Sequence, residues 1–240
     1  MVGTKLSILQ RIEPLVAGNK NIKILDLGCG QSRNFLPLLQ RYPALTYVGI
    51  EPNERDASIA SGLLQQHKNA RILNQYAYTR PAGYEEFDIC ISLSAIEHIK
   101  RLDTFLENSV QCTRRGGKII HLYDLGHALY PKTAKERLHV FLGNTCPALL
   151  PEKKFVRYVK EEEVCEALSR CGADITDITY HQMVSHKSFL KIFQADNHEK
   201  AALAEEMVEW EFKISKYLKE LSARQRERLF PSICIWAARK

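Results

Sequence analysis

The chain of 240 residues has no apolar run near 20 residues, the length that a helix needs to cross a bilayer. Its first 15 residues are amphipathic, because Gln10, Arg11 and Glu13 interrupt the apolar positions, and they do not resemble a signal peptide. Together the two absences predict a soluble, cytoplasmic protein without a membrane span.

The chain has only seven cysteines, an odd number, and no two of them are spaced as Cys-x-x-Cys. This pattern argues against a disulfide framework and against a zinc site. Cys29, Cys90, Cys112 and Cys234 fall within apolar stretches, so we expect them to be reduced, buried and inert.

The net charge is also small, with a formal value of +6 at pH 7. Basic residues cluster only in residues 153–157 and 224–228, and neither cluster has the interleaved aromatic residues of the kind that stack bases. These clusters favour a solvated surface over a nucleic-acid or anionic-lipid patch. A nucleic-acid partner is therefore not expected.

The most informative segment runs from residue 24 to residue 53. A short apolar run ends in Asp26 and continues into Gly28-Cys29-Gly30, and a second apolar run ends in Glu51. In a parallel strand–helix–strand unit, both strand ends meet at one edge of the sheet, where the Glu51 carboxylate suits the two hydroxyls of a ribose. Ser32 stands where a dinucleotide-binding turn would have a third glycine, which favours a cofactor without phosphates.

Two later segments complete a pattern. Residues 86–99 read as a buried strand followed by Glu97-His98, and residues 114–123 read as a glycine turn followed by another buried strand. With residues 24–53, they resemble the small-molecule branch of the class I S-adenosylmethionine-dependent methyltransferases. The resemblance covers about residues 20–124.

This resemblance implies S-adenosylmethionine as the cofactor and a set of binding residues. One departure is Tyr76, which occupies the position where the family commonly has an acid that holds adenine. Adenine would instead meet backbone groups near Ala77, or stack on Tyr76 or Tyr78. The expected cofactor-binding residues are Asp26, Gly28, Gly30, Glu51, Pro52, Asn53, Tyr76, Ala77, Ser92 and Ser94.

Alternating apolar patterns predict an α/β fold: a Rossmann-like, doubly wound sheet of seven strands, mostly parallel with an antiparallel last strand, plus helical insertions. The expected strands are residues 22–26, 46–51, 70–75, 87–92, 117–123, 174–180 and 232–238. Helices are expected at residues 32–41, 54–66, 101–113 and 160–171. We expect a single methyltransferase domain, 1–240, divided into an N-terminal helix (1–19), a cofactor-binding core (20–124), a lid insertion (125–157), a helix and sixth strand (158–181), a helical insertion (182–231) and a seventh strand (232–240).

The insertion before the last strand contains neither glycine nor proline over residues 197–229, which predicts one long amphipathic helix. This helix either packs on its own domain or joins two subunits of a homodimer. Its apolar positions recur at spacings of four and three: Leu203, Met207, Trp210, Ile214, Tyr217 and Leu221.

Methyl transfer from a sulfonium requires mainly positioning, but a hydroxyl acceptor also requires a base to remove its proton. His127, paired with Asp124, is one candidate for the base, with His98 as its rival; an amine acceptor would need none. His121 lies inside an apolar strand and is expected to be a core histidine, whereas His139 lies in the lid. No metal is expected, because residues 92–94 lack the acidic ligands of the magnesium-dependent catechol-type enzymes.

The expected acceptor is a small polar molecule. Residues 123–144 resemble the lids of bacterial surface-polysaccharide and secondary-metabolite enzymes, which makes a sugar hydroxyl the first hypothesis and another small metabolite the second. Two alternatives remain open: an RNA methyltransferase, if the basic clusters form one strip beside the crevice, and a noncatalytic partner protein, if Tyr76 or Tyr78 plugs it.

Overall fold

A computed structural model describes residues 3–19, 21–83, 86–192 and 196–240. Its strands form one seven-stranded sheet in the order β3-β2-β1-β4-β5-β7-β6. All strands run parallel except β7, which is antiparallel to both β5 and β6. The predicted fold class is therefore confirmed. The strands are β1 (Lys23–Leu27), β2 (Thr46–Ile50), β3 (Ala70–Leu73), β4 (Phe87–Leu93), β5 (Thr113–Asp124), β6 (Ala173–His181) and β7 (Ser232–Arg239).

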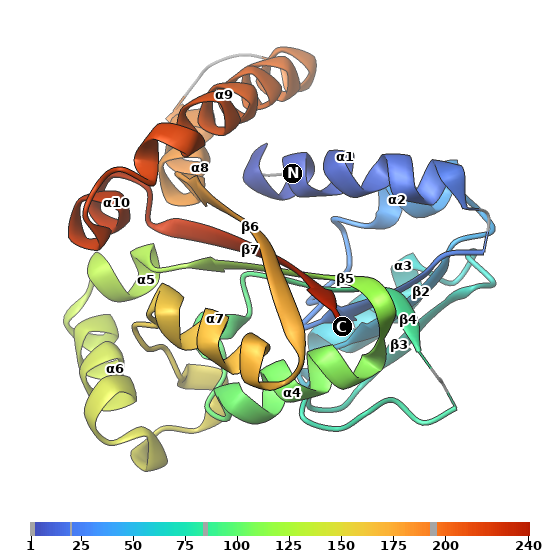
Figure 1. Ribbon diagram of the computed structural model, residues 1–240, viewed down its shortest axis with the longest axis horizontal. Coiled ribbons are helices and arrows are strands. Elements are labelled where there is room, and N and C mark those ends of the chain that lie inside the picture. The colour runs from blue at the N-terminus through green and yellow to red at the C-terminus, as the bar shows by residue number, and fades with distance from the viewer. Residues whose placement is uncertain (1–2, 20, 84–85, 193–195) are drawn as a thin grey trace.

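Helices cover both faces of this sheet (Figure 1). On one face, α1 (Gly3–Gly18) and α2 (Leu36–Arg41) bury Ile12 and Leu39 against Ile24 of β1. On the other, α4 (Leu102–Cys112) packs against β4 and β5 and α7 (Glu161–Arg170) against β6 and β7, and their apolar side chains share one core with Leu25 of β1. Neighbouring side chains of β1 thus enter opposite cores, as the two-residue period of a strand requires.

The strand order reverses between β1 and β4, which are direct neighbours although two strands separate them in sequence. Such a reversal opens a crevice at the carboxyl ends of the strands. The glycine turn follows β1 at this edge, and α3 (Glu54–Leu63) begins just after β2. A short 3-10 helix, η1 (Ile96–His98), follows β4 at the same edge.

Two elements begin four residues away from their expected starts. The helix expected from residue 32 begins only at Leu36, because Ser32 has a left-handed backbone (φ +55°) and the chain turns before the helix starts. Strand β5 begins at Thr113, four residues earlier than expected, and passes through Gly116, whose φ is +72°.

Both insertions are helical. The lid contains α5 (Gly126–Leu129), α6 (Ala134–Thr145) and the 3-10 helices η2 (Pro147–Leu149) and η3 (Glu152–Lys154). The second insertion contains α8 (Met183–Ile192), α9 (Asn197–Leu218) and α10 (Ala223–Leu229). The prediction of a single helix over residues 197–229 is wrong, because the chain breaks after Leu218 and Ser222 caps a new helix together with Gln225.

Helix α9 packs on its own domain, against α1, α8 and β6 (Figure 1). A Cβ placed on Gly3 would lie 2.9 Å from the backbone oxygen of Ala204, so the two helices touch closely. Trp210 and Tyr217 of the predicted apolar stripe are exposed. The buried positions of α9 are Ala204, Val208, Glu211, Ser215 and Leu218. The homodimer stays a prediction.

Among the described residues, none of the helices combines the length and the apolar character that a bilayer crossing requires.

Replacing Leu218 by Ala should lower the free energy of unfolding by about 2 to 5 kcal/mol, because its side chain is buried in the core beside β6. The matched change, Tyr217→Ala, removes an exposed ring and should cost about 0.5 kcal/mol or less if the protein is a monomer. Urea denaturation measures both. Equal costs, with a change in sedimentation for Tyr217→Ala, would instead place this face in a subunit contact.

Candidate active site

The carboxylate of Glu51 lies between the glycine turn and the start of α3. Its Oε2 accepts a hydrogen bond from the backbone N–H of Gly30 (2.9 Å), and its Oε1 accepts one from Asn53 (2.8 Å). The side chain is almost buried, and burial raises its pKa against the effect of these donors. Two backbone contacts therefore fix the carboxylate at the edge of the crevice.

Two glycines shape the turn that carries one of these donors. Gly28 has φ +77°, and a Cβ at this position would lie 2.8 Å from the side chain of Ala95. Gly30 has φ +54°, again in the left-handed region that favours glycine. The turn therefore needs glycine at Gly28 both for its conformation and for space.

Asp26 lies beneath the turn. The Tyr47 hydroxyl donates to its Oδ2 (2.8 Å) and also contacts the Ser32 hydroxyl (3.1 Å). Burial raises the pKa of Asp26 to about 7. Its Oδ1 has no hydrogen-bond partner among the described residues, so one buried acceptor remains available under the cofactor turn.

A cavity of about 600 Å³ opens beside the turn, a size typical of ligand sites. Three predicted cofactor residues do not line it: Asp26, Gly30 and Ser92, the last of which bonds to His121 instead. Sequence reasoning missed part of the wall, including Arg55 and Glu152, which no motif marks. The predicted residues that do line it are Gly28, Glu51, Pro52, Asn53, Tyr76, Ala77 and Ser94.

Tyr76 and Tyr78 form one wall of this cavity and leave its volume open. Their rings are stacked, with centroids 5.9 Å apart and planes at 8°. The Tyr78 hydroxyl also bonds to Glu152 of the lid. The wall offers an aromatic face for stacking. Among the described residues neither ring fills the cavity, so the plug that would favour a noncatalytic protein is not seen.

His98 lies on η1 and lines the cofactor cavity. Its Nδ1 is 3.0 Å from the carbonyl oxygen of Phe155. Because a carbonyl can only accept, Nδ1 carries the hydrogen, and it is Nε2 that holds the lone pair when the ring is uncharged. The backbone N–H of Arg157 also donates to the Glu97 carbonyl (3.0 Å), so two contacts tie the end of the lid to η1.

His127 lines a second cavity of about 410 Å³, on the lid side of the first. Its ring centroid is 5.5 Å from that of His98, so the two cavities approach each other across this pair of rings. Partial burial lowers the pKa of His127, while the nearby Asp124 opposes that shift. The lowered pKa favours the neutral ring, which can accept a proton.

Asp124 and His127 share no hydrogen bond in the described structure. Asp124 Oδ1 accepts from the backbone N–H of Gly126 (2.8 Å), which fixes the start of α5. The carboxylate nearest to His127 Nδ1 is Glu97 Oε1, at 3.9 Å. Glu97 is fully buried, and its Oε2 has no partner among the described residues. The Glu-His pair in the sequence is the signal that points to this residue.

His121 is the core histidine that its apolar strand predicts. It is fully buried, and its two ring nitrogens contact the hydroxyls of Ser92 (2.8 Å) and Ser109 (3.1 Å). Burial lowers its pKa to about 3, so it stays neutral. His121 has no access to an acceptor.

Ligand atoms of Glu97, His98 and His127 lie within 4.8 Å of one another. Two imidazoles and one carboxylate do not suit magnesium, which prefers oxygen ligands in octahedral geometry. Such a set suits zinc or iron(II) better, so the expectation that the protein holds no metal stays a prediction.

The fold and the glycine turn agree with the comparison with known families. A family model described as a methyltransferase domain matches residues 5–178. The chain belongs to the class I S-adenosylmethionine-dependent methyltransferases. S-adenosylmethionine is accordingly its cofactor, and the cavity beside Glu51 has the size, the aromatic wall and the buried acceptors that suit a ribose and a base.

Among similar proteins, a ubiquinone biosynthesis O-methyltransferase of Rhizobium johnstonii is 26% identical over 167 residues, which cover 67% of this chain and 63% of that protein. The match thus spans less than two thirds of the relative. YcgJ of Bacillus subtilis has a TM-score of 0.60 at 14% identity, covering 99% of this chain and 98% of that one. Phosphoethanolamine N-methyltransferase 2 of Haemonchus contortus, solved with S-adenosyl-L-methionine, has a TM-score of 0.61 at 16% identity, covering 98% and 52%.

The Glu51→Gln variant should bind S-adenosylmethionine more weakly by roughly 1.5 to 3 kcal/mol, or ten- to 150-fold, because a charged acceptor becomes neutral. Calorimetric titration measures the affinity, with Glu206→Gln on the exposed face of α9 as a matched control that should bind like the wild type. Unchanged affinity in a folded Glu51→Gln protein would remove Glu51 from the cofactor site.

Proposed function

We propose that this methyltransferase transfers a methyl group to a hydroxyl of a small polar acceptor that binds in the second cavity. The observation that carries the proposal is the meeting of the two cavities at His98 and His127. The bound cofactor supplies a methyl group on a positively charged sulfur, which is already activated for displacement. The protein therefore has to position the hydroxyl and take its proton.

His127 is the proposed base. Its neutral ring faces the acceptor cavity, and the buried carboxylate of Glu97 lies close enough to stabilise the imidazolium that forms. Asp124 acts on this ring indirectly, by holding the first turn of α5. His98 is the rival base, since its hydrogen bond to Phe155 leaves Nε2 able to accept a proton.

The first acceptor hypothesis is a sugar hydroxyl, as the resemblance of the lid suggests. A phenolic hydroxyl is the second, because the curated relatives are named as ubiquinone biosynthesis O-methyltransferases. Both acceptors take the methyl group on oxygen and both need a base. The proposal therefore holds for either acceptor.

RNA methylation is less well supported. Of the two basic clusters, Arg157 pairs with Glu163, and Arg226 pairs with Glu161 (3.8 Å). Arg226 also lies over the ring of Tyr180. Cations held by acidic partners within the protein offer less to a phosphate backbone than free ones.

A methyl-transfer screen with radiolabelled cofactor tests the acceptor class. The panel contains free and nucleotide-linked sugars, substituted catechols and RNA. We expect transfer to a sugar or a phenol, with a methyl ether as the product. Transfer only to RNA, or to an amine nitrogen, would overturn the proposal.

With the acceptor so identified, His127→Gln should lower turnover by roughly a hundredfold to ten-thousandfold and leave cofactor affinity nearly unchanged. Because the pKa of His127 lies below the ordinary value for histidine, the ring becomes protonated only at a lower pH than an ordinary histidine. The wild-type rate should therefore fall at a lower pH than an ordinary histidine base would give. His139→Gln, a histidine elsewhere in the same cavity, is the matched control. Should His98→Gln lose turnover while His127→Gln keeps it, His98 is the base; full activity in both variants would leave no histidine base here.

Removing magnesium should not slow the reaction. Dialysis against EDTA, followed by the same assay with and without added magnesium, is expected to give equal rates, because the donors near His127 do not suit this ion. A rate that collapses and returns with magnesium would contradict the expectation.

A further inference from the structure

The second cavity has a basic wall. Lys132 lies before α6, and Lys187 and Lys191 lie on α8, so two separate insertions contribute lysines to one hollow. None of the three lysine side chains forms an ion pair within the part of the chain that the structure describes. Lys187 is close enough to His127 to help lower the pKa of that ring.

One carboxylate, that of Glu136, faces the same cavity. It accepts hydrogen bonds from the backbone N–H groups of Lys132 (2.6 Å) and Thr133 (3.2 Å), which makes it part of the cap of α6. Its two histidines aside, three lysines and one carboxylate give this wall a net charge of +2. A phosphate group carries about −1.5 to −2 near neutral pH and would balance it.

We propose that the acceptor cavity binds a phosphate group of the acceptor through Lys132, Lys187 and Lys191. The inference rests on the proposed function, since it identifies the acceptor as a phosphorylated molecule with a free hydroxyl. The lysines surround the phosphate, and His127, at the side of the cavity that faces the cofactor, is left for the hydroxyl. The charge of the acceptor thus determines which of its hydroxyls is methylated.

The lysine-bearing helix is anchored to the domain. His186, the residue before Lys187, is buried, and its Nε2 lies 3.1 Å from Glu211 Oε1 on α9. Glu211 also binds His181 Nδ1 (2.9 Å) at the end of β6. Buried polar contacts therefore hold α8 in place and keep its lysines on the cavity wall, which reduces the ordering cost of binding.

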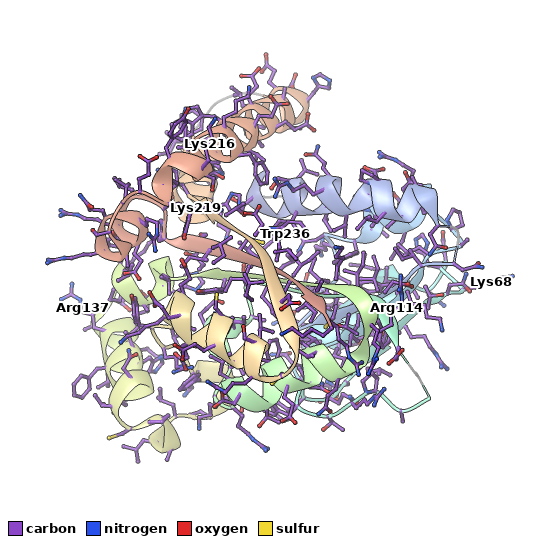
Figure 2. The ribbon with its side chains drawn as sticks, viewed as in Figure 1. Lys68, Arg114, Arg137, Lys216, Lys219 and Trp236 are labelled. Atoms are coloured by element: carbon purple, nitrogen blue, oxygen red, sulfur yellow. The ribbon has the colours of Figure 1, made fainter. Side chains whose placement is uncertain are left out.

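Equilibrium dialysis with radiolabelled inorganic phosphate tests the proposal, with S-adenosylhomocysteine present to fill the cofactor cavity. Wild-type protein should bind phosphate saturably, and the affinity should fall by about tenfold for each lysine removed in Lys187→Gln and Lys191→Gln. Lys68→Gln is the matched control; Figure 2 shows Lys68 at the far end of the molecule from Arg137 of α6. This control should bind phosphate like the wild type.

Glu136→Gln tests the charge balance in the opposite direction. Glutamine can still cap α6 at this position, so the helix is kept while the negative charge is lost. Phosphate should then bind more tightly than to wild-type protein. Equal or weaker binding would contradict the balance of charge on which the proposal rests.

Three further results would overturn the proposal: no saturable phosphate binding by the wild type, unchanged binding in the lysine variants, or tighter binding of succinate, a dicarboxylate, than of phosphate. Calorimetric titration with S-adenosylmethionine is run on every variant. If the wild type binds the cofactor but not phosphate, the phosphate proposal is wrong and the proposed function is unaffected. If the wild type does not bind the cofactor, the proposed function is also wrong.

Discussion

The site depends on one carboxylate whose position the backbone fixes. Glu51 directly follows β2, and its carboxylate accepts from Gly30 in the turn after β1 and from Asn53 at the start of α3. Three elements, β1, β2 and α3, are thus joined at a single side chain. The cost of burying that charge is offset by two backbone donors, one in the glycine turn and one at the start of α3. These contacts within the protein fix the shape of this edge of the crevice.

The lid contributes to the site through contacts with η1. The carbonyl of Phe155 holds the ring of His98, and the Glu97 carbonyl holds the N–H of Arg157. Gly143 of α6 packs so tightly on the backbone of Val156 that a side chain there would clash. The segment that follows β5 therefore lines both cavities, with Glu152 in the first and His127 in the second, and its contacts with η1 help to hold His98 close to His127.

Sequence patterns predict the sheet well because buried parallel strands read as continuous apolar runs, and glycine marks the turn at Gly28 and Gly30. Cofactor residues at strand ends follow from the same topology. Contacts between distant segments are different. The proximity of Glu97 to His127 depends on how two loops pack, whereas Asp124, only three residues from His127, uses its Oδ1 locally on Gly126. Spacing along the chain cannot distinguish these two cases.

The buried face of α9 is a second feature that the sequence pattern does not predict, and it bears on the proposed acceptor cavity. Counting apolar residues places the seam through Trp210 and Tyr217, yet the helix buries Glu211 and Ser215 instead. A buried carboxylate is tolerated only when it is paired, and Glu211 binds His181 and His186. Those partners lie outside α9, so no pattern within the helix reveals them. Because His186 belongs to α8, the polar contact that shifts the buried face of α9 also positions the helix that carries Lys187 and Lys191. The polar contacts that pack this insertion thus also place two of the three lysines of the proposed acceptor cavity.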